Sequence, residues 1–125
     1  PEWLLPHLWK IKQPYNVNVA AQAAVLASLE DTDYLLRNVQ RIVAERERLY
    51  GLLQTVPYLQ PYPSRSNFIL CRVLGRNAHE LKGNLEKRGV LLRYYDKPGL
   101  EDCIRVSVGT PEQTDVLMNV LRNLY

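Results

Sequence analysis

The stretch from Cys103 to Glu112 constrains the fold of this 125-residue chain more than any other. Ile104, Val106 and Val108 alternate with polar residues, which is typical of a half-buried strand. Gly109 follows at once and permits a sharp turn. A threonine, a proline and, three residues after the threonine, a glutamine come next, and this order favours a helix that begins with a capping box. The stretch therefore predicts a strand, a tight turn and a helix in direct succession.

Arg105 lies in the middle of this expected strand. A guanidinium held on a rigid strand is well suited to bind a carboxylate through two parallel hydrogen bonds. The alternative is an ordinary arginine on the solvent face, because most arginines are exposed. The segment alone leaves both interpretations open.

The rest of the chain predicts an α+β domain. Apolar spacing and cap residues indicate helices over 19–29, 32–56, 78–87 and 111–124, and strands over 67–73, 90–94 and 103–108. The apolar stripe of the helix at 32–56 is expected to pack across the sheet. Prolines and other turn formers make 58–65 a loop. This order predicts a two-layer sandwich in which helices cover a small, mostly antiparallel, three-stranded sheet.

Composition excludes several classes of function. The net charge of +3 comes from basic residues scattered among acidic ones, so no nucleic acid partner is expected. No stretch of 18 apolar residues occurs, which argues against a membrane span. Cys71 and Cys103 fall inside expected strands without metal-ligand spacing, so we expect buried thiols, no metal site and a cytoplasmic location.

Three further segments, 12–18, 62–70 and 89–95, precede the strand that carries Arg105. In this order and at these spacings they resemble the C-terminal part of histidinol-phosphate aminotransferases, which are fold-type I enzymes that use pyridoxal 5'-phosphate. The resemblance covers essentially the full length of the chain. Threonine-phosphate decarboxylases and aromatic aminotransferases share much of the same pattern, so the small domain of either enzyme is an alternative.

The resemblance implies a substrate-binding site. It assigns the α-carboxylate of the substrate to Arg105 and the rest of the substrate to Arg93, and it places Asn67 near the substrate. Arg93 and Arg105 also lie on neighbouring expected strands, where two guanidiniums repel each other unless an anion lies between them. Tyr15 and Asn16 belong to a loop that, in related enzymes, approaches the active site, often that of the other subunit. The alternatives are solvated arginines, an asparagine that bonds its own backbone, and a loop that only caps a helix.

The resemblance also implies what the chain lacks. None of its lysines lies in the Ser-x-x-Lys context that the family uses for its Schiff base with the cofactor, and no glycine-rich phosphate loop is present. We therefore expect residues 1–17 to be an apolar linker from a missing cofactor domain and residues 18–125 to be the small, substrate-clamping domain.

The complete enzyme, called the parent below, would transfer an amino group between glutamate and imidazole-acetol phosphate in histidine biosynthesis. It is expected to be a homodimer that binds pyridoxal 5'-phosphate, glutamate and a phosphorylated amino-acid-like substrate. The 125-residue chain alone is expected to be inactive and to bind no cofactor. The alternative from a different class of function is a stand-alone α+β binding or regulatory module.

Overall fold

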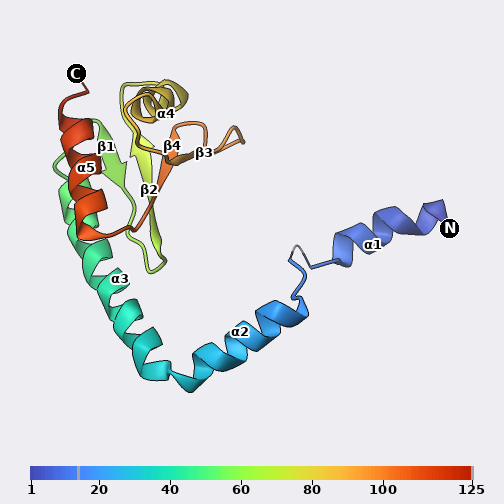
Figure 1. Ribbon diagram of the computed structural model, residues 1–125. Helices are drawn as coiled ribbons and strands as arrows, with labels where there is room; N and C mark the ends of the chain where they lie inside the picture. Colours follow the sequence, from blue (N-terminus) through green and yellow to red (C-terminus); the bar gives the residue numbers. More distant parts are fainter. Residues whose placement is uncertain (14, 125) are drawn as a thin grey trace. The chain divides into compact units, whose positions relative to one another are not determined.

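The computed structural model describes residues 1–13 and 15–124. The chain forms two compact units, Pro1–Leu36 and Arg37–Tyr125, and each is described by itself. The first unit contains a short 3-10 helix η1 (Glu2–Leu4) and the helices α1 (Leu5–Ile11) and α2 (Val19–Glu30). Helix α3 (Thr32–Leu53) begins in the first unit and continues into the second (Figure 1).

The apolar residues of helix α2 are spread around the helix and do not gather on one face. Its backbone begins with a cap, since the Asn18 side chain accepts a hydrogen bond from the Ala21 amide at 2.8 Å. Val25, Leu26 and Leu29 are all more than half exposed. A helix with an apolar surface all round is normally buried within a larger protein, so this unit leaves much apolar surface uncovered.

The second unit is built on a four-stranded sheet. Its strands are β1 (Leu59–Pro61), β2 (Phe68–Val73), β3 (Arg93–Tyr94) and β4 (Cys103–Ser107), in the spatial order β1-β2-β4-β3. Each strand pairs antiparallel with its neighbours. The helices are the second part of α3, then α4 (Ala78–Glu86) and α5 (Pro111–Arg122). Figure 1 shows α3 and α5 side by side along the sheet, and α4 contacts β3 and β4.

One face of the sheet is buried beneath the helices. Ile69 and Cys71 of β2 lie opposite Val106 and Ile104 of β4, and all four are buried. They belong to one core cluster with residues of the three helices: Leu49, Leu53, Ala78, Leu81, Leu85, Leu117, Met118 and Leu121. The α+β class and the arrangement of helices over one face are therefore as the sequence predicts.

The sheet has four strands rather than the three expected. The additional strand β1 lies in the stretch 58–65, which its prolines had marked as a loop. Proline is tolerated there because β1 is an edge strand, where an amide hydrogen is not needed on the open side.

The third strand along the chain is also shorter than expected. Only Arg93 and Tyr94 pair with β4. The amide of Val90 instead donates to the carbonyl of Leu85 at the end of α4. Gly89 makes this possible with a positive φ of 80°, the left-handed conformation that ends many helices.

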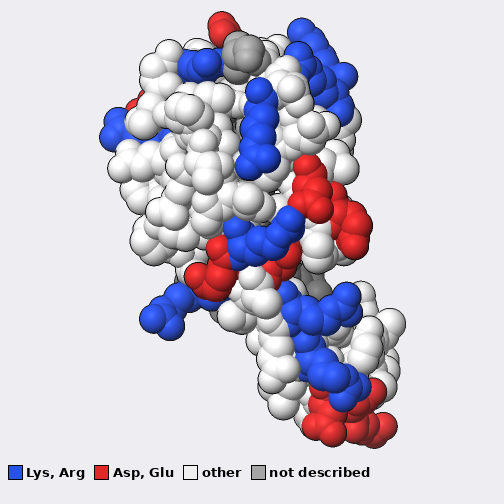
Figure 2. Space-filling view, turned by 90° about the vertical axis from the view of Figure 1, so that its left-hand side faces the viewer, with Lys and Arg blue, Asp and Glu red and all other residues white. Residues whose placement is uncertain are grey.

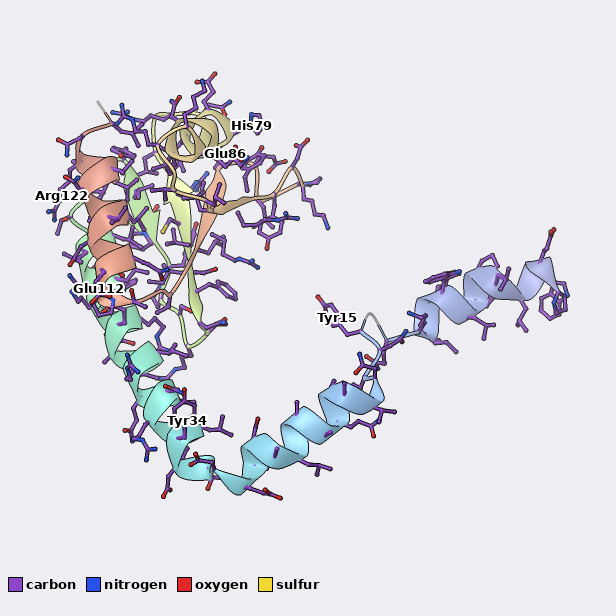
Figure 3. The ribbon with its side chains drawn as sticks, in the orientation of Figure 1. Tyr15, Tyr34, His79, Glu86, Glu112 and Arg122 are labelled. Atoms are coloured by element: carbon purple, nitrogen blue, oxygen red, sulfur yellow. The ribbon has the colours of Figure 1, made fainter. Side chains whose placement is uncertain are left out.

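Helix α5 begins as the sequence predicts. The Gln113 side chain accepts from the Thr110 amide at 2.9 Å, and the Thr110 hydroxyl accepts from the Gln113 amide at 3.4 Å. Glu112 lies in the first turn and Arg122 in the last, as Figure 3 shows. These charges complement the helix dipole.

The apolar stripe of α3 is covered only in its second half. Leu49 and Leu53 are buried, whereas Val39 and Ile42 stay 53% and 40% exposed. On the face made by α3 and α5, basic and acidic side chains are interspersed (Figure 2), and Arg48 forms ion pairs with Glu45 and Asp115 there. Within the described part of the chain, no helix has the length and apolar character needed to cross a membrane.

Candidate functional site

The open face of the sheet, opposite the helices, brings two of the expected site residues together. Arg93 of β3 and Arg105 of β4 are direct partners in the antiparallel register. Side chains that lie directly opposite on antiparallel strands project from the same face with their Cβ atoms about 4.5–5.5 Å apart. Two positive charges therefore project side by side, although like charges in this position destabilise a sheet.

Aromatic rings hold the two guanidiniums. The Cζ atom of Arg105 lies 5.1 Å from the centre of the Phe68 ring and 5.6 Å from that of Tyr95. The Cζ atom of Arg93 lies 5.3 Å from the same Tyr95 ring. Each distance is within the range of an attractive cation–π contact. Tyr95 thus contacts both arginines, and Phe68 contacts Arg105 alone.

The guanidinium of Arg105 has no anionic partner among residues 1–13 and 15–124. Its Nε atom is buried and makes no hydrogen bond within this part of the chain. A buried donor without an acceptor is costly, and here it adjoins a second cation. On the same face, by contrast, Arg72 donates to Asp102 at 3.0 Å. The pair of Arg93 and Arg105 therefore suits an external anion, and a planar carboxylate matches the guanidinium fork.

Asn67 is close in the fold but has a different position. It directly precedes β2, and its backbone carbonyl accepts from the Val108 amide at 2.8 Å, which extends the ladder between β2 and β4. Its side chain is exposed and accepts from the Ser66 hydroxyl at 3.4 Å. Neither bond joins the Asn67 side chain to its own backbone, as the structural alternative expected, and a substrate contact from Asn67 stays a prediction.

Tyr15 and Asn16 belong to the first unit. They lie in the segment between α1 and α2, and both are exposed, with Tyr15 86% accessible (Figure 3). The capping role in this segment falls to Asn18, not to either of these residues. Their part in an active site stays a prediction as well.

The sequence did not predict that the rings of Phe68 and Tyr95 both contact Arg105. On β2, Leu70 pairs with Arg105 and Phe68 pairs with Ser107. Phe68 is two residues from Leu70, so strand alternation could have placed it on the same sheet face as Arg105. Tyr95 follows the last paired residue of β3, where alternation no longer applies.

Tyr94, which precedes Tyr95, has a different environment. It is opposite Ile104, and its ring packs edge-on against that of His79 with 5.2 Å between the ring centres. Partial burial raises the pKa of the Tyr94 hydroxyl.

Comparison with known proteins decides the family. A model of the family described as aminotransferase class I and II matches residues 1–121. This chain belongs to that family. A histidinol-phosphate aminotransferase from Roseiflexus castenholzii is 52% identical to this aminotransferase chain in an alignment of 126 residues that covers 98% of the chain and 34% of the relative. The chain thus spans about a third of the length of this curated relative.

Solved aminotransferases share the fold. The histidinol-phosphate aminotransferase from Clostridium acetobutylicum matches with a TM-score of 0.79 at 21% identity, over 98% of this chain and 38% of that protein. The enzyme from Sinorhizobium meliloti, solved in complex with pyridoxal-5'-phosphate, matches with a TM-score of 0.73 at 25% identity, over 94% and 33%. The resemblance inferred from the sequence motifs is therefore confirmed at the level of the family.

The remaining titratable groups do not form a second site of an obvious kind. The described residues contain no group of three or more His, Cys, Asp or Glu side chains that could hold a metal ion. Cys71 is fully buried, and burial raises the pKa of its thiol to about 12. Such a thiol is protonated at neutral pH and is a poor nucleophile. The arginine pair on the open sheet face is the best-supported site.

Proposed function

We propose that this chain is the C-terminal, substrate-clamping part of a histidinol-phosphate aminotransferase. The parent would transfer an amino group between glutamate and imidazole-acetol phosphate in histidine biosynthesis. The observation that carries the proposal is the guanidinium of Arg105. Among the described residues its buried Nε has no acceptor, it contacts two aromatic rings, and its cross-strand partner is Arg93. The name of the similar Roseiflexus castenholzii protein favours this enzyme over a decarboxylase, an aromatic aminotransferase or a stand-alone module.

The two arginines suit the chemistry of both substrates. Glutamate carries two carboxylates, and histidinol phosphate, the amino form of the other substrate, carries a phosphate. In this proposal Arg105 binds the α-carboxylate of glutamate through two parallel hydrogen bonds, and Arg93 binds its second carboxylate. Histidinol phosphate has no carboxylate, so its phosphate takes this place between the two arginines. Fixing the substrate at both ends orients the bond to the α-hydrogen for proton removal. Asn67, Tyr15 and Asn16 remain candidates for further substrate contacts.

Pyridoxal 5'-phosphate fits the parent, but this chain does not supply the groups that hold it. When bound, the cofactor supplies an electron sink for the amino group that is transferred. A lysine is needed to bind it covalently, and the open sheet face presents arginines. Among the described lysines, Lys82 forms an ion pair with Glu86, and Lys12 lies over the ring of Trp9 in the first unit. We expect the cofactor lysine in the remaining two thirds of the parent.

Uncovered apolar surface supports a place within a larger protein. Apolar residues are spread around helix α2, and the first half of the α3 stripe is exposed. Trp3 and Trp9 are each 69% exposed. Burial of such surface is strongly favourable, and a parent about three times as long could cover it. A homodimeric parent in the cytoplasm stays part of this proposal.

The proposal is tested with the parent enzyme and with this chain alone. The parent should convert histidinol phosphate and 2-oxoglutarate to imidazole-acetol phosphate and glutamate, whereas the 125-residue chain should show no turnover with added pyridoxal 5'-phosphate. A parent that decarboxylates phosphothreonine, or that prefers aromatic amino acids to histidinol phosphate, would refute the assignment.

A further inference from the structure

Tyr95 occupies a position that the proposed function does not explain. Its ring lies 5.3 Å from the Cζ atom of Arg93 and 5.6 Å from that of Arg105. The two arginines are direct partners across β3 and β4. One aromatic ring therefore attracts two cations that repel each other.

This arrangement limits how the guanidiniums can move. Arginine side chains have several rotatable bonds, and without a partner they would spread apart in solvent. Arg105 is held by a second ring, that of Phe68, whereas the aromatic contact of Arg93 in the described structure is with Tyr95 alone. The spacing between the two cations therefore depends on Tyr95 more than on any other described side chain.

We propose that Tyr95 is a positioning residue that fixes the spacing of Arg93 and Arg105 and so favours a substrate that engages both arginines, such as glutamate with its two carboxylates, over an amino acid with a single carboxylate. The inference rests on the proposed function, because it requires that the two arginines bind substrate. A preset spacing lowers the cost of ordering both side chains when such a substrate binds. A substrate with one carboxylate needs only Arg105, which Phe68 also holds, and it gains little from the preset spacing.

The experiment measures selectivity in the parent enzyme loaded with pyridoxal 5'-phosphate. The kcat/KM for glutamate, with two carboxylates, is divided by that for norvaline, with one carboxylate. We expect Tyr95→Leu to lower this ratio about tenfold, the order of a lost cation–π contact in a partly desolvated site. We expect Tyr95→Phe to restore most of the ratio, because phenylalanine keeps the ring.

The matched control is Tyr94→Leu. Tyr94 directly precedes Tyr95 but packs against His79, and among the described residues no cation–π contact joins its ring to either arginine. This control should lower the melting temperature of the parent and leave the ratio unchanged. General loosening of β3 would instead change the ratio in both leucine variants.

Each outcome bears on the inference. A ratio that falls in Tyr95→Leu and recovers in Tyr95→Phe supports it. A ratio that stays constant while both substrates weaken equally would show a purely structural role and overturn it. A Tyr95→Phe variant as impaired as Tyr95→Leu would assign the effect to the hydroxyl and also overturn it. If Arg105→Met leaves kcat/KM for glutamate unchanged, the proposed function itself fails, and that result is independent of Tyr95.

Discussion

Replacing Arg105 by methionine should have opposite effects on folding and on substrate binding. Arg105 has a buried Nε donor that finds no acceptor in the described part of the chain, and a direct cross-strand partner of the same charge. Methionine removes both unfavourable features and keeps an apolar stem between the rings of Phe68 and Tyr95.

The expected gain can be estimated from these contacts. A buried donor without a partner costs about 1–3 kcal/mol. Against this, two cation–π contacts at a partly exposed site are lost, at about 0.5–1 kcal/mol each. Taking the middle of each range, the free energy of unfolding of the 125-residue chain should therefore rise by about 0.5 kcal/mol, as urea denaturation followed by circular dichroism would show.

Arg72→Met is the matched control. Arg72 projects from the same face but forms an ion pair with Asp102 at 3.0 Å, with half of its side chain exposed. An exposed pair of this kind contributes at most about 1 kcal/mol, so this variant should be neutral or slightly less stable. If Arg105→Met loses as much stability as Arg72→Met or more, the guanidinium of Arg105 has a structural role, and the reasoning from its missing acceptor is wrong.

In the parent, the same Arg105→Met substitution should weaken glutamate binding. Two hydrogen bonds between charged groups are lost, and each contributes about 1.5–3 kcal/mol. Even the lower value for both corresponds to a rise of about 100-fold in the KM for glutamate. Arg105→Lys should recover only part of this loss, because an ammonium cannot form the two parallel bonds of a guanidinium.

Three further predictions concern the stability of the second unit. Gly109→Ala should lower the free energy of unfolding by about 1 kcal/mol through loss of the α5 cap, because an added Cβ would collide with the Gln113 Oε1 atom. Gly51 lies in helix α3, and an added Cβ there would meet no described atom within 4 Å. Gly51→Ala should therefore raise the free energy of unfolding by about 0.5–1 kcal/mol in the same urea titration. Burial raises the pKa of the Cys71 thiol from 9.0 to about 12, so unfolding releases a proton above pH 9. The free energy of unfolding should therefore fall above pH 9 by up to about 1.4 kcal/mol per pH unit. An equally steep fall in a Cys71→Val chain would contradict this prediction. Hydrogen bonds from the Thr110 hydroxyl and the Glu112 amide lower the pKa of the Glu112 carboxyl from 4.5. The contribution of Glu112 to the free energy of unfolding is therefore complete above pH 4.5, and it is lost as the pH falls through the pKa of the folded chain. Glu112→Gln should be less stable than the native chain at pH 7 and equally stable near pH 2.

Strand alternation made much of the second unit predictable from the sequence. Ile104 and Val106 face the core and Arg105 faces away, as the period of two requires. The short turn between the strands also made Arg93 and Arg105 neighbours. The exact register could not be predicted, because it depends on the pairing of β3 and β4 over only two residues.

The features that the sequence did not reveal depend on contacts between distant segments. Pro61 belongs to a strand only because β2 offers it an edge. Val90 leaves the sheet because its amide is bonded to the end of α4. Tyr95 lies past the last strand pair, so no periodicity could direct its ring toward the two arginines. Each case is a tertiary effect that overrides local preference.

The position of Arg105 on β4 explains how one strand can serve both folding and binding. β4 is bonded to β2 on one side and to β3 on the other, so its backbone is held from both sides. Its inward residues bury apolar surface and stabilise the unit. Its outward arginine can therefore carry an unfavourable, unpaired charge without unfolding the domain. A binding residue left unpaired in this way gains its partner only from the substrate, so the free energy that destabilises the empty site becomes available for recognition.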